Sequence, residues 1–191
     1  MDYRSVVERQ FQASVAARLD CADSVIPALE RAGQLLTDCL LSDGKVLVAG
    51  EGAALQDASW LAAGLAQHSE RERPGLPVVL LSACPGLHDH TEPEHLAQPV
   101  RALGHAGDVL VLFTHHGTHP ALGHAIHAAH EHQMPVVVLT GHDGGNVPAL
   151  LDEKDVEVRV PLTTRFRIHE LFLLSSFALC DLVEWHIFGG E

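Results

Sequence analysis

The chain has 191 residues, of which 47% are hydrophobic and 19% charged, a balance typical of one globular domain. Acidic residues number 25 against 12 Lys and Arg, and the resulting formal charge of -13 disfavours direct contact with nucleic acid or anionic membranes. The four cysteines form no C-x-x-C pair, and the apolar stretches are too short to span a bilayer. We therefore expect a soluble cytoplasmic protein with reduced thiols.

Apolar residues at helical spacing predict two leading helices, over residues 2–19 and 24–41. Strands and helices alternate from there on. Strands are expected at 45–49, 77–82, 108–114, 135–140 and 156–160, and helices at 53–67, 92–103, 119–133, 147–151 and 164–188. Five apolar strands separated by helices predict a parallel sheet covered on both faces, which is a three-layer α/β sandwich. We expect a single domain over residues 1–191, with an α/β core and long closing helix in residues 44–191.

Ligands of such open sheets bind at the carboxyl ends of the strands, so the loops there are the candidate sites. The first strand runs into Gly50-Glu51-Gly52-Ala53-Ala54. A dinucleotide fingerprint would need glycine where Leu55 stands, and no Gly-Lys-Ser/Thr of a P-loop is present. What remains is a loop able to hold a small anion, opposed by the Glu51 carboxylate unless that side chain turns away or caps the following helix.

The third strand runs into a second loop, Thr114-His115-His116-Gly117-Thr118-His119, which carries three histidines. No His-Glu-x-x-His pairing accompanies them, so we expect no bound metal and a solvated histidine-rich helix after the loop. The pair of loops predicts a ligand site made of Gly50, Glu51, Gly52, Ala54, Thr114, His116, Gly117 and His119. Cys84, with His88 and His90 nearby, is either a nucleophile or a small residue at a turn, and the turn is favoured.

Several segments carry a resemblance to a known family. They are Glu70 to Pro77, Val100 to Leu110, Leu139 to Gly145, Asp155 to Pro161 and Cys180 to Leu182. These segments resemble the sugar isomerase (SIS) domain proteins of the phosphoheptose isomerase group, especially its non-enzymatic branch, the DnaA initiator-associating proteins. The resemblance covers nearly the whole chain. It implies a flavodoxin-like SIS fold and a homotetramer, with the N-terminal helices in residues 1–43 used in oligomerisation.

The resemblance also aligns the family's acid–base and metal residues with Trp60, Gly64, His169 and Phe177. Trp, Gly and Phe side chains cannot give and take a proton. The phosphate-binding serine of the first loop aligns with Ala54, and Thr114 alone keeps a hydroxyl of the second loop's serines. We therefore expect no catalysis and no cofactor, with Trp60 and Phe177 filling the space of a metal and sugar.

These features favour a non-catalytic adaptor that helps assemble the replication initiator. In that branch an aliphatic–aromatic pair near the C-terminus contacts the initiator, and Ile187 and Phe188 stand in the matching place. Packing of these two residues within the oligomer is the alternative role. Two other functions remain open: a phosphoheptose isomerase that converts sedoheptulose 7-phosphate to D-glycero-D-manno-heptose 7-phosphate, and a regulator that binds a sugar phosphate without turnover.

Overall fold

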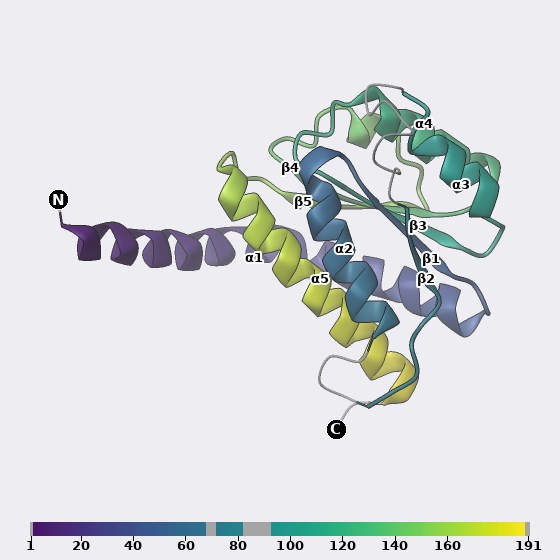
Figure 1. Ribbon diagram of the computed structural model, residues 1–191, viewed down its shortest axis with the longest axis horizontal. Coiled ribbons are helices and arrows are strands. Elements are labelled where there is room, and N and C mark those ends of the chain that lie inside the picture. Colours follow the sequence, from purple (N-terminus) through teal and green to yellow (C-terminus); the bar gives the residue numbers. More distant parts are fainter. Residues whose placement is uncertain (1, 68–71, 82–92, 190–191) are drawn as a thin grey trace.

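The computed structural model describes residues 2–67, 72–81 and 93–189 (Figure 1). Cys84, His88 and His90 lie outside these described residues. The described chain forms a central sheet with helices on both faces, and one helix extends well beyond this body. The predicted three-layer α/β architecture is confirmed.

The sheet has five parallel strands in the order β2-β1-β3-β4-β5. They are β1 (Val46–Gly50), β2 (Val78–Leu81), β3 (Val109–Thr114), β4 (Val136–Gly141) and β5 (Val156–Val160). Strands β1, β3 and β4 are buried along their whole length, which explains why their sequences are apolar runs without alternation. Every predicted strand end lies within one residue of the observed end.

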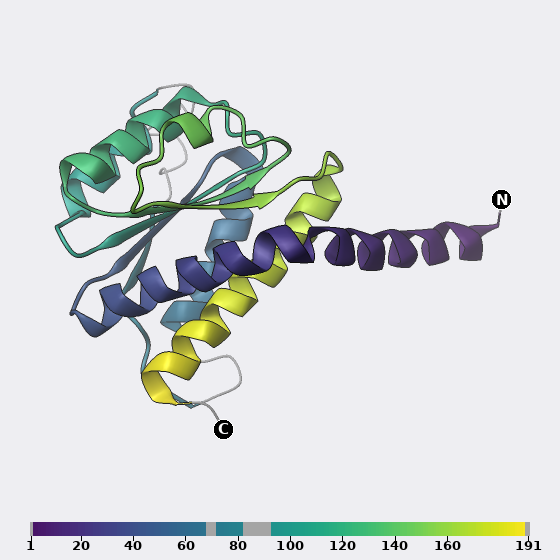
Figure 2. The ribbon, with the colours of Figure 1, turned by 180° about the vertical axis from the view of Figure 1, so that it is seen from behind.

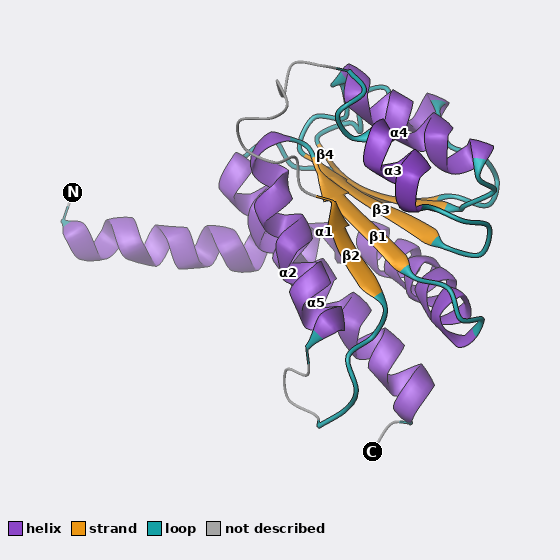
Figure 3. Cartoon of the chain, turned by 45° about the vertical axis from the view of Figure 1, so that its right-hand side comes forward, coloured by secondary structure: helices purple, strands orange, loops and turns teal. Residues whose placement is uncertain are grey.

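Helices α1 (Tyr3–Leu41), α2 (Leu55–Ala66) and α5 (Arg165–Phe188) cover one face of the sheet. Helices α3 (Ala97–Leu103) and α4 (Pro120–Glu131) cover the other, together with the short turn η2 (Val147–Ala149) (Figure 3). Neighbouring strand residues point to opposite layers, so that Val46 and Val48 join the first core while Leu47 and Ala49 join the second. A second short turn, η1 (Gly52–Ala54), leads into α2.

The two predicted leading helices are one continuous helix, α1. The segment 20–23 contains neither Gly nor Pro, and Cys21 within it is buried at the contact with the core, so packing carries the helix through the expected break. The first half of α1 projects from the body as an arm (Figure 2). Its large apolar side chains are exposed, with Phe11 at 71% and Leu19 at 72%.

Helix α5 is long and apolar enough to cross a membrane by length and composition alone. In the structure it packs against α1 and α2 over the sheet, and 44% of its most apolar window is buried. The expectation that the apolar stretches are too short to span a bilayer is therefore wrong for α5 by length, although this helix forms part of the layer over the sheet.

Candidate functional site

The carboxyl ends of β1 and β3 meet where the strand order reverses, which is the usual ligand-binding position in an open α/β sheet. The two predicted loops are tied together there. The amide of Glu51 donates to the carbonyl of Phe113 at 2.9 Å. The Thr114 hydroxyl donates to Glu51 Oε2 at 3.1 Å and accepts from the Gly117 amide at 3.1 Å.

A cavity of about 380 Å³ opens at this junction. It is lined by Gly50, Glu51, Gly52, Leu55, Leu81, His95, Leu96 and His119. The predicted residues Gly50, Glu51, Gly52 and His119 therefore lie together on its wall. Ala54, Thr114 and Gly117 are buried behind it, and His116 is exposed on the second loop. A larger cavity of about 720 Å³ lies at the opposite edge of the sheet, where residues 106–107 and 133–135 lead into β3 and β4.

Glu51 neither turns away from the loop nor caps the next helix. Its side chain makes no capping hydrogen bond to η1 and instead accepts from Thr114. The carboxylate therefore stays on the cavity wall, where it disfavours a phosphate placed next to it.

The second loop needs glycine at position 117. Gly117 has a φ of +66°, and a Cβ there would lie 2.1 Å from the Gly144 carbonyl oxygen. The Gly117 carbonyl accepts from the Asn146 amide at 2.9 Å, which fastens this loop to the one after β4. The rings of His116 and His142 consequently lie 4.5 Å apart.

Asp57, His115 and His169 form a cluster that was not predicted from the sequence. Asp57 lies in the first turn of α2, His115 follows β3 and His169 lies near the start of α5. His169 Nδ1 lies 2.7 Å from Asp57 Oδ2 and 2.9 Å from Oδ1, so the carboxylate accepts the imidazole N–H. Helices α2 and α5 cover the same face of the sheet, and the loop after β3 lies at its carboxyl edge. Only the fold brings positions so far apart in sequence together.

His115 is held rigidly within this cluster. Its ring stacks on Phe172 with centroids 5.8 Å apart and meets the His169 ring edge-on at 4.2 Å. The residue is only 6% exposed. Its Nε2 atom lies 3.6 Å from Asp57 Oδ2, which is too far for a hydrogen bond, and it has no hydrogen-bond partner.

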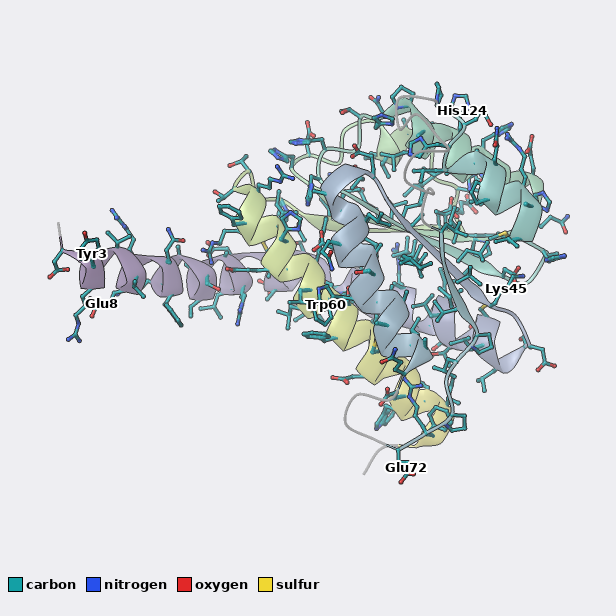
Figure 4. The ribbon with its side chains drawn as sticks, viewed as in Figure 1. Tyr3, Glu8, Lys45, Trp60, Glu72 and His124 are labelled. Carbon is teal, nitrogen blue, oxygen red and sulfur yellow. The ribbon has the colours of Figure 1, made fainter. Side chains whose placement is uncertain are left out.

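Trp60 and Phe177 do not fill the cavity in the single chain. Their rings form an edge-to-face pair 6.5 Å apart, and the residues are 49% and 47% exposed. Figure 4 shows Trp60 on the outer surface of α2, beside α5. Gly64 has a packing reason of its own, because a Cβ there would lie 2.7 Å from the Cys180 sulfur where α2 meets α5.

The histidines of α4 are engaged with acidic neighbours. His124, labelled in Figure 4, contacts Glu94, and His127 Nε2 lies 3.3 Å from Glu131. His130 Nε2 lies 2.8 Å from Asp155.

At the chain end, the predicted partner-binding residues have contacts within the chain. Ile187 packs against the core, and the Arg73 guanidinium lies 5.9 Å from the Phe188 ring centroid.

Comparison with known proteins identifies the family of this fold. Residues 10–141 match the family model described as the SIS domain. A phosphoheptose isomerase of Chromohalobacter salexigens is 37% identical over 195 residues, covering 100% of this chain and 99% of that protein. One from Methylococcus capsulatus is 39% identical, with 96% of each chain covered.

Solved structures agree with the sequence comparisons. A phosphoheptose isomerase from Francisella tularensis matches with a TM-score of 0.87 and 30% identity, covering 96% of this chain and 98% of that chain. The phosphoheptose isomerase from Neisseria gonorrhoeae matches with a TM-score of 0.86 and 32% identity, covering 96% and 99%. The predicted resemblance to the SIS and phosphoheptose isomerase group is confirmed.

The expected adaptor function is wrong. Relatives at 36–39% identity along the full chain carry the name of an enzyme, and the matched structures carry the same name. The expectation that the chain lacks catalytic activity is contradicted by the same relatives, and they lend no support to a replication initiator as partner. The assignment of the family's catalytic positions to Trp60, Gly64, His169 and Phe177 stays a prediction.

Proposed function

The chain belongs to the SIS domain family, and we propose that it is a ketose–aldose isomerase acting on a phosphorylated sugar of the phosphoheptose class. The supporting observation is the buried carboxylate of Asp57, which holds the imidazole of the partly exposed His169 at the carboxyl edge of the sheet. The full-length relatives named phosphoheptose isomerase supply the substrate class.

The reaction moves a proton between C1 and C2 of the open-chain sugar, so it needs a group that both takes and returns a proton. In the Asp57–His169 pair, the carboxylate accepts the N–H of Nδ1 and fixes the ring orientation. The other ring nitrogen, Nε2, is then available for proton transfer. The carboxylate also stabilises the imidazolium that forms when Nε2 takes the proton from carbon. Nε2 then delivers a proton to C2 while the hydroxyl proton of O1 is transferred to O2, so the sugar keeps its atoms and the pair ends in its starting state. In D₂O the proton held on Nε2 exchanges with solvent before delivery, so deuterium appears at C2.

The cavity between the two loops is the candidate space for the phosphorylated chain of the sugar. Leu55 lines this cavity and Asp57 follows two residues later, so the first turn of α2 contributes both to the cavity wall and to the Asp57–His169 pair. The His95 and His119 rings lie 5.9 Å apart on its wall and would attract a phosphate when protonated. The Glu51 carboxylate opposes that attraction.

The test is proton transfer itself. Sedoheptulose 7-phosphate is incubated with the protein in D₂O, and both the aldose product and deuterium at C2 are followed by NMR. His169→Gln, which removes the base while keeping a polar side chain, should lower the rate by about 10² to 10⁴. His127→Gln, on the exposed face of α4, is the matched control. Binding of the sugar phosphate without turnover by the unaltered protein would contradict the isomerase and favour a regulator.

We propose further that the protein is a cytoplasmic homotetramer in which the arm of α1 contacts another copy. A helix gains most of its stability from packing, yet the arm exposes Tyr3, Phe11, Val15 and Leu19. Two hydrogen bonds attach the arm to the body: the Ser14 hydroxyl donates to the Glu170 carboxylate, and the Arg167 guanidinium donates to the Gln10 side-chain oxygen. Light scattering coupled to size exclusion should give four chains, and Phe11→Asp with Leu19→Asp should give fewer. A monomer at all concentrations would contradict the proposal.

A further inference from the structure

We propose that Asp57, His115 and His169 form a binding site for one divalent transition-metal ion, with Zn²⁺ the best match. One ligand atom from each residue lies within 4.8 Å of the others. Three separate elements supply them, so the group is built by the tertiary fold. The site shares His169 with the set implied by the family resemblance. Asp57 and His115 are its other ligands, because Trp60, Gly64 and Phe177 have no side-chain atom that coordinates a metal.

The spacing fits a tetrahedral ion. Zinc binds imidazole nitrogen and carboxylate oxygen at roughly 2.0 to 2.2 Å, which places two ligand atoms about 3.3 to 3.5 Å apart at a tetrahedral angle. Asp57 Oδ2 lies 2.7 Å from His169 Nδ1 and 3.6 Å from His115 Nε2, which brackets that separation. An ion would take the place of the proton that His169 shares with Asp57, so the pair needs to part by less than an ångström.

The unpartnered nitrogen of His115 is an independent sign of a ligand. Nearly all buried polar side-chain atoms in proteins have a hydrogen-bond partner, yet His115 Nε2 has none although the residue is 6% exposed. Its ring is fixed by the stack on Phe172, so it has little freedom to seek another partner. A metal at the centre of the cluster would satisfy this nitrogen without moving the ring.

The donor set points to the kind of metal. Two imidazoles and one carboxylate form the three-ligand set of catalytic zinc sites, in which the fourth position is left for water or substrate. With neutral imidazoles, the carboxylate offsets one of the two positive charges. The other three-residue group among the described residues, His130 with Asp152 and Asp155, is less suited. There the Asp155 oxygens already accept from the Val136 and Asp152 amides and from His130.

This inference does not require the proposed isomerase. The Asp57–His169 pair can transfer a proton without a metal, and the site can bind a metal without any turnover. Isomerisation is therefore measured separately on chelator-treated and metal-loaded protein, so that failure of one proposal leaves the other open to its own result.

Cobalt is a suitable probe, because Co²⁺ in a tetrahedral site absorbs visible light strongly whereas octahedral surface-bound Co²⁺ absorbs weakly. Chelator-treated protein is titrated with Co²⁺, and the bound Co²⁺ is then displaced with Zn²⁺. We expect one equivalent with a tetrahedral spectrum. His115→Phe keeps the aromatic stack, Asp57→Asn keeps the side-chain shape, and each should weaken Zn²⁺ binding at least tenfold. Circular dichroism establishes that both variants are folded.

The matched control is the double variant His124→Gln with His127→Gln, which removes two exposed histidines of α4. It should keep the tetrahedral equivalent. The proposed site would be overturned if the control lost the tetrahedral Co²⁺ ion, or if both His115→Phe and Asp57→Asn kept it. Either result would assign the metal to surface histidines. Absence of a tetrahedral spectrum in the unaltered protein would overturn the site whatever the variants do.

Discussion

Arg73 and Glu184 form a buried ion pair that fastens the C-terminal end of α2 to α5. The side chains are 2% and 10% exposed. Nε and Nη2 of the guanidinium lie 2.8 Å and 2.7 Å from Glu184 Oε1. Nη1 also donates to the carbonyls of Leu65 and Pro74, and Nη2 to those of Gly64 and Gln67, at 2.7 to 3.2 Å, so that the five N–H groups are shared among six contacts. We predict that Arg73→Met strongly destabilises the fold.

The expected loss is about 3 to 5 kcal/mol, which is the usual cost of removing one partner and leaving the other charge buried. That is a large share of a domain stability of about 5 to 15 kcal/mol. Combining Arg73→Met with Glu184→Met removes the stranded charge, so the double variant should be more stable than Arg73→Met alone. It should not recover fully, because four carbonyls have lost a donor.

Urea unfolding followed by circular dichroism, at one fixed protein concentration, measures these differences. Arg101→Met is the matched control, because Arg101 pairs with Glu94 and Glu131 on the surface, and it should leave the unfolding midpoint almost unchanged. A loss below about 1 kcal/mol for Arg73→Met, or a double variant less stable than the single one, would refute the argument from a stranded charge.

Three further predictions follow from single residues. Burial opposes ionisation of Asp108, but hydrogen bonds from Lys45 and the His105 amide lower the pKa of this carboxyl group. The ionised carboxylate therefore stabilises the fold at pH values above its ordinary pKa of about 3.9, and this stabilisation is lost as the pH falls through the lowered pKa. The difference in urea midpoint between the unaltered protein and Asp108→Asn should therefore shrink from pH 7 to pH 2; a constant difference would contradict this. Burial raises the pKa of Cys39 to about 11 and of Cys180 to about 12. In a background with Cys21→Ser and Cys84→Ser, neither should react with a thiol reagent at pH 8 until urea unfolds the chain, and rapid labelling of the native protein would contradict their burial. Glu51→Gln should lower the inhibition constant of inorganic phosphate, as a competitor of the sugar phosphate, about fivefold, because it removes a like charge about 4 Å away in water. An unchanged inhibition constant would place the phosphate elsewhere.

Much of the fold could be predicted from the sequence because its signals are local. The strand at 156–160 was predicted with the observed ends, since alternating Val residues are bounded by Asp155 and Pro161. The break in α1 was predicted wrongly because polar residues at 20 and 23 resemble a helix end. Only the packing of Cys21 and Val25 against the core shows that the helix continues.

The candidate site was only partly predictable. The loops after β1 and β3 could be located, because parallel strands direct their carboxyl ends to one edge. Asp57 and His115 could not be joined to His169, because no sequence spacing links three residues that come from two helices and a loop. The outward placement of Trp60 was equally inaccessible, since it depends on which side of α2 faces α5.

The proposed isomerase activity assigns proton transfer on a phosphorylated sugar to the Asp57–His169 pair. Its most direct test is the rate of deuterium incorporation at C2 during conversion of sedoheptulose 7-phosphate, compared between the unaltered protein and His169→Gln. We expect steady turnover by the unaltered protein and a rate lower by about 10² to 10⁴ for His169→Gln. Equal rates for the two proteins, or no turnover by the unaltered protein with and without Zn²⁺, would contradict it.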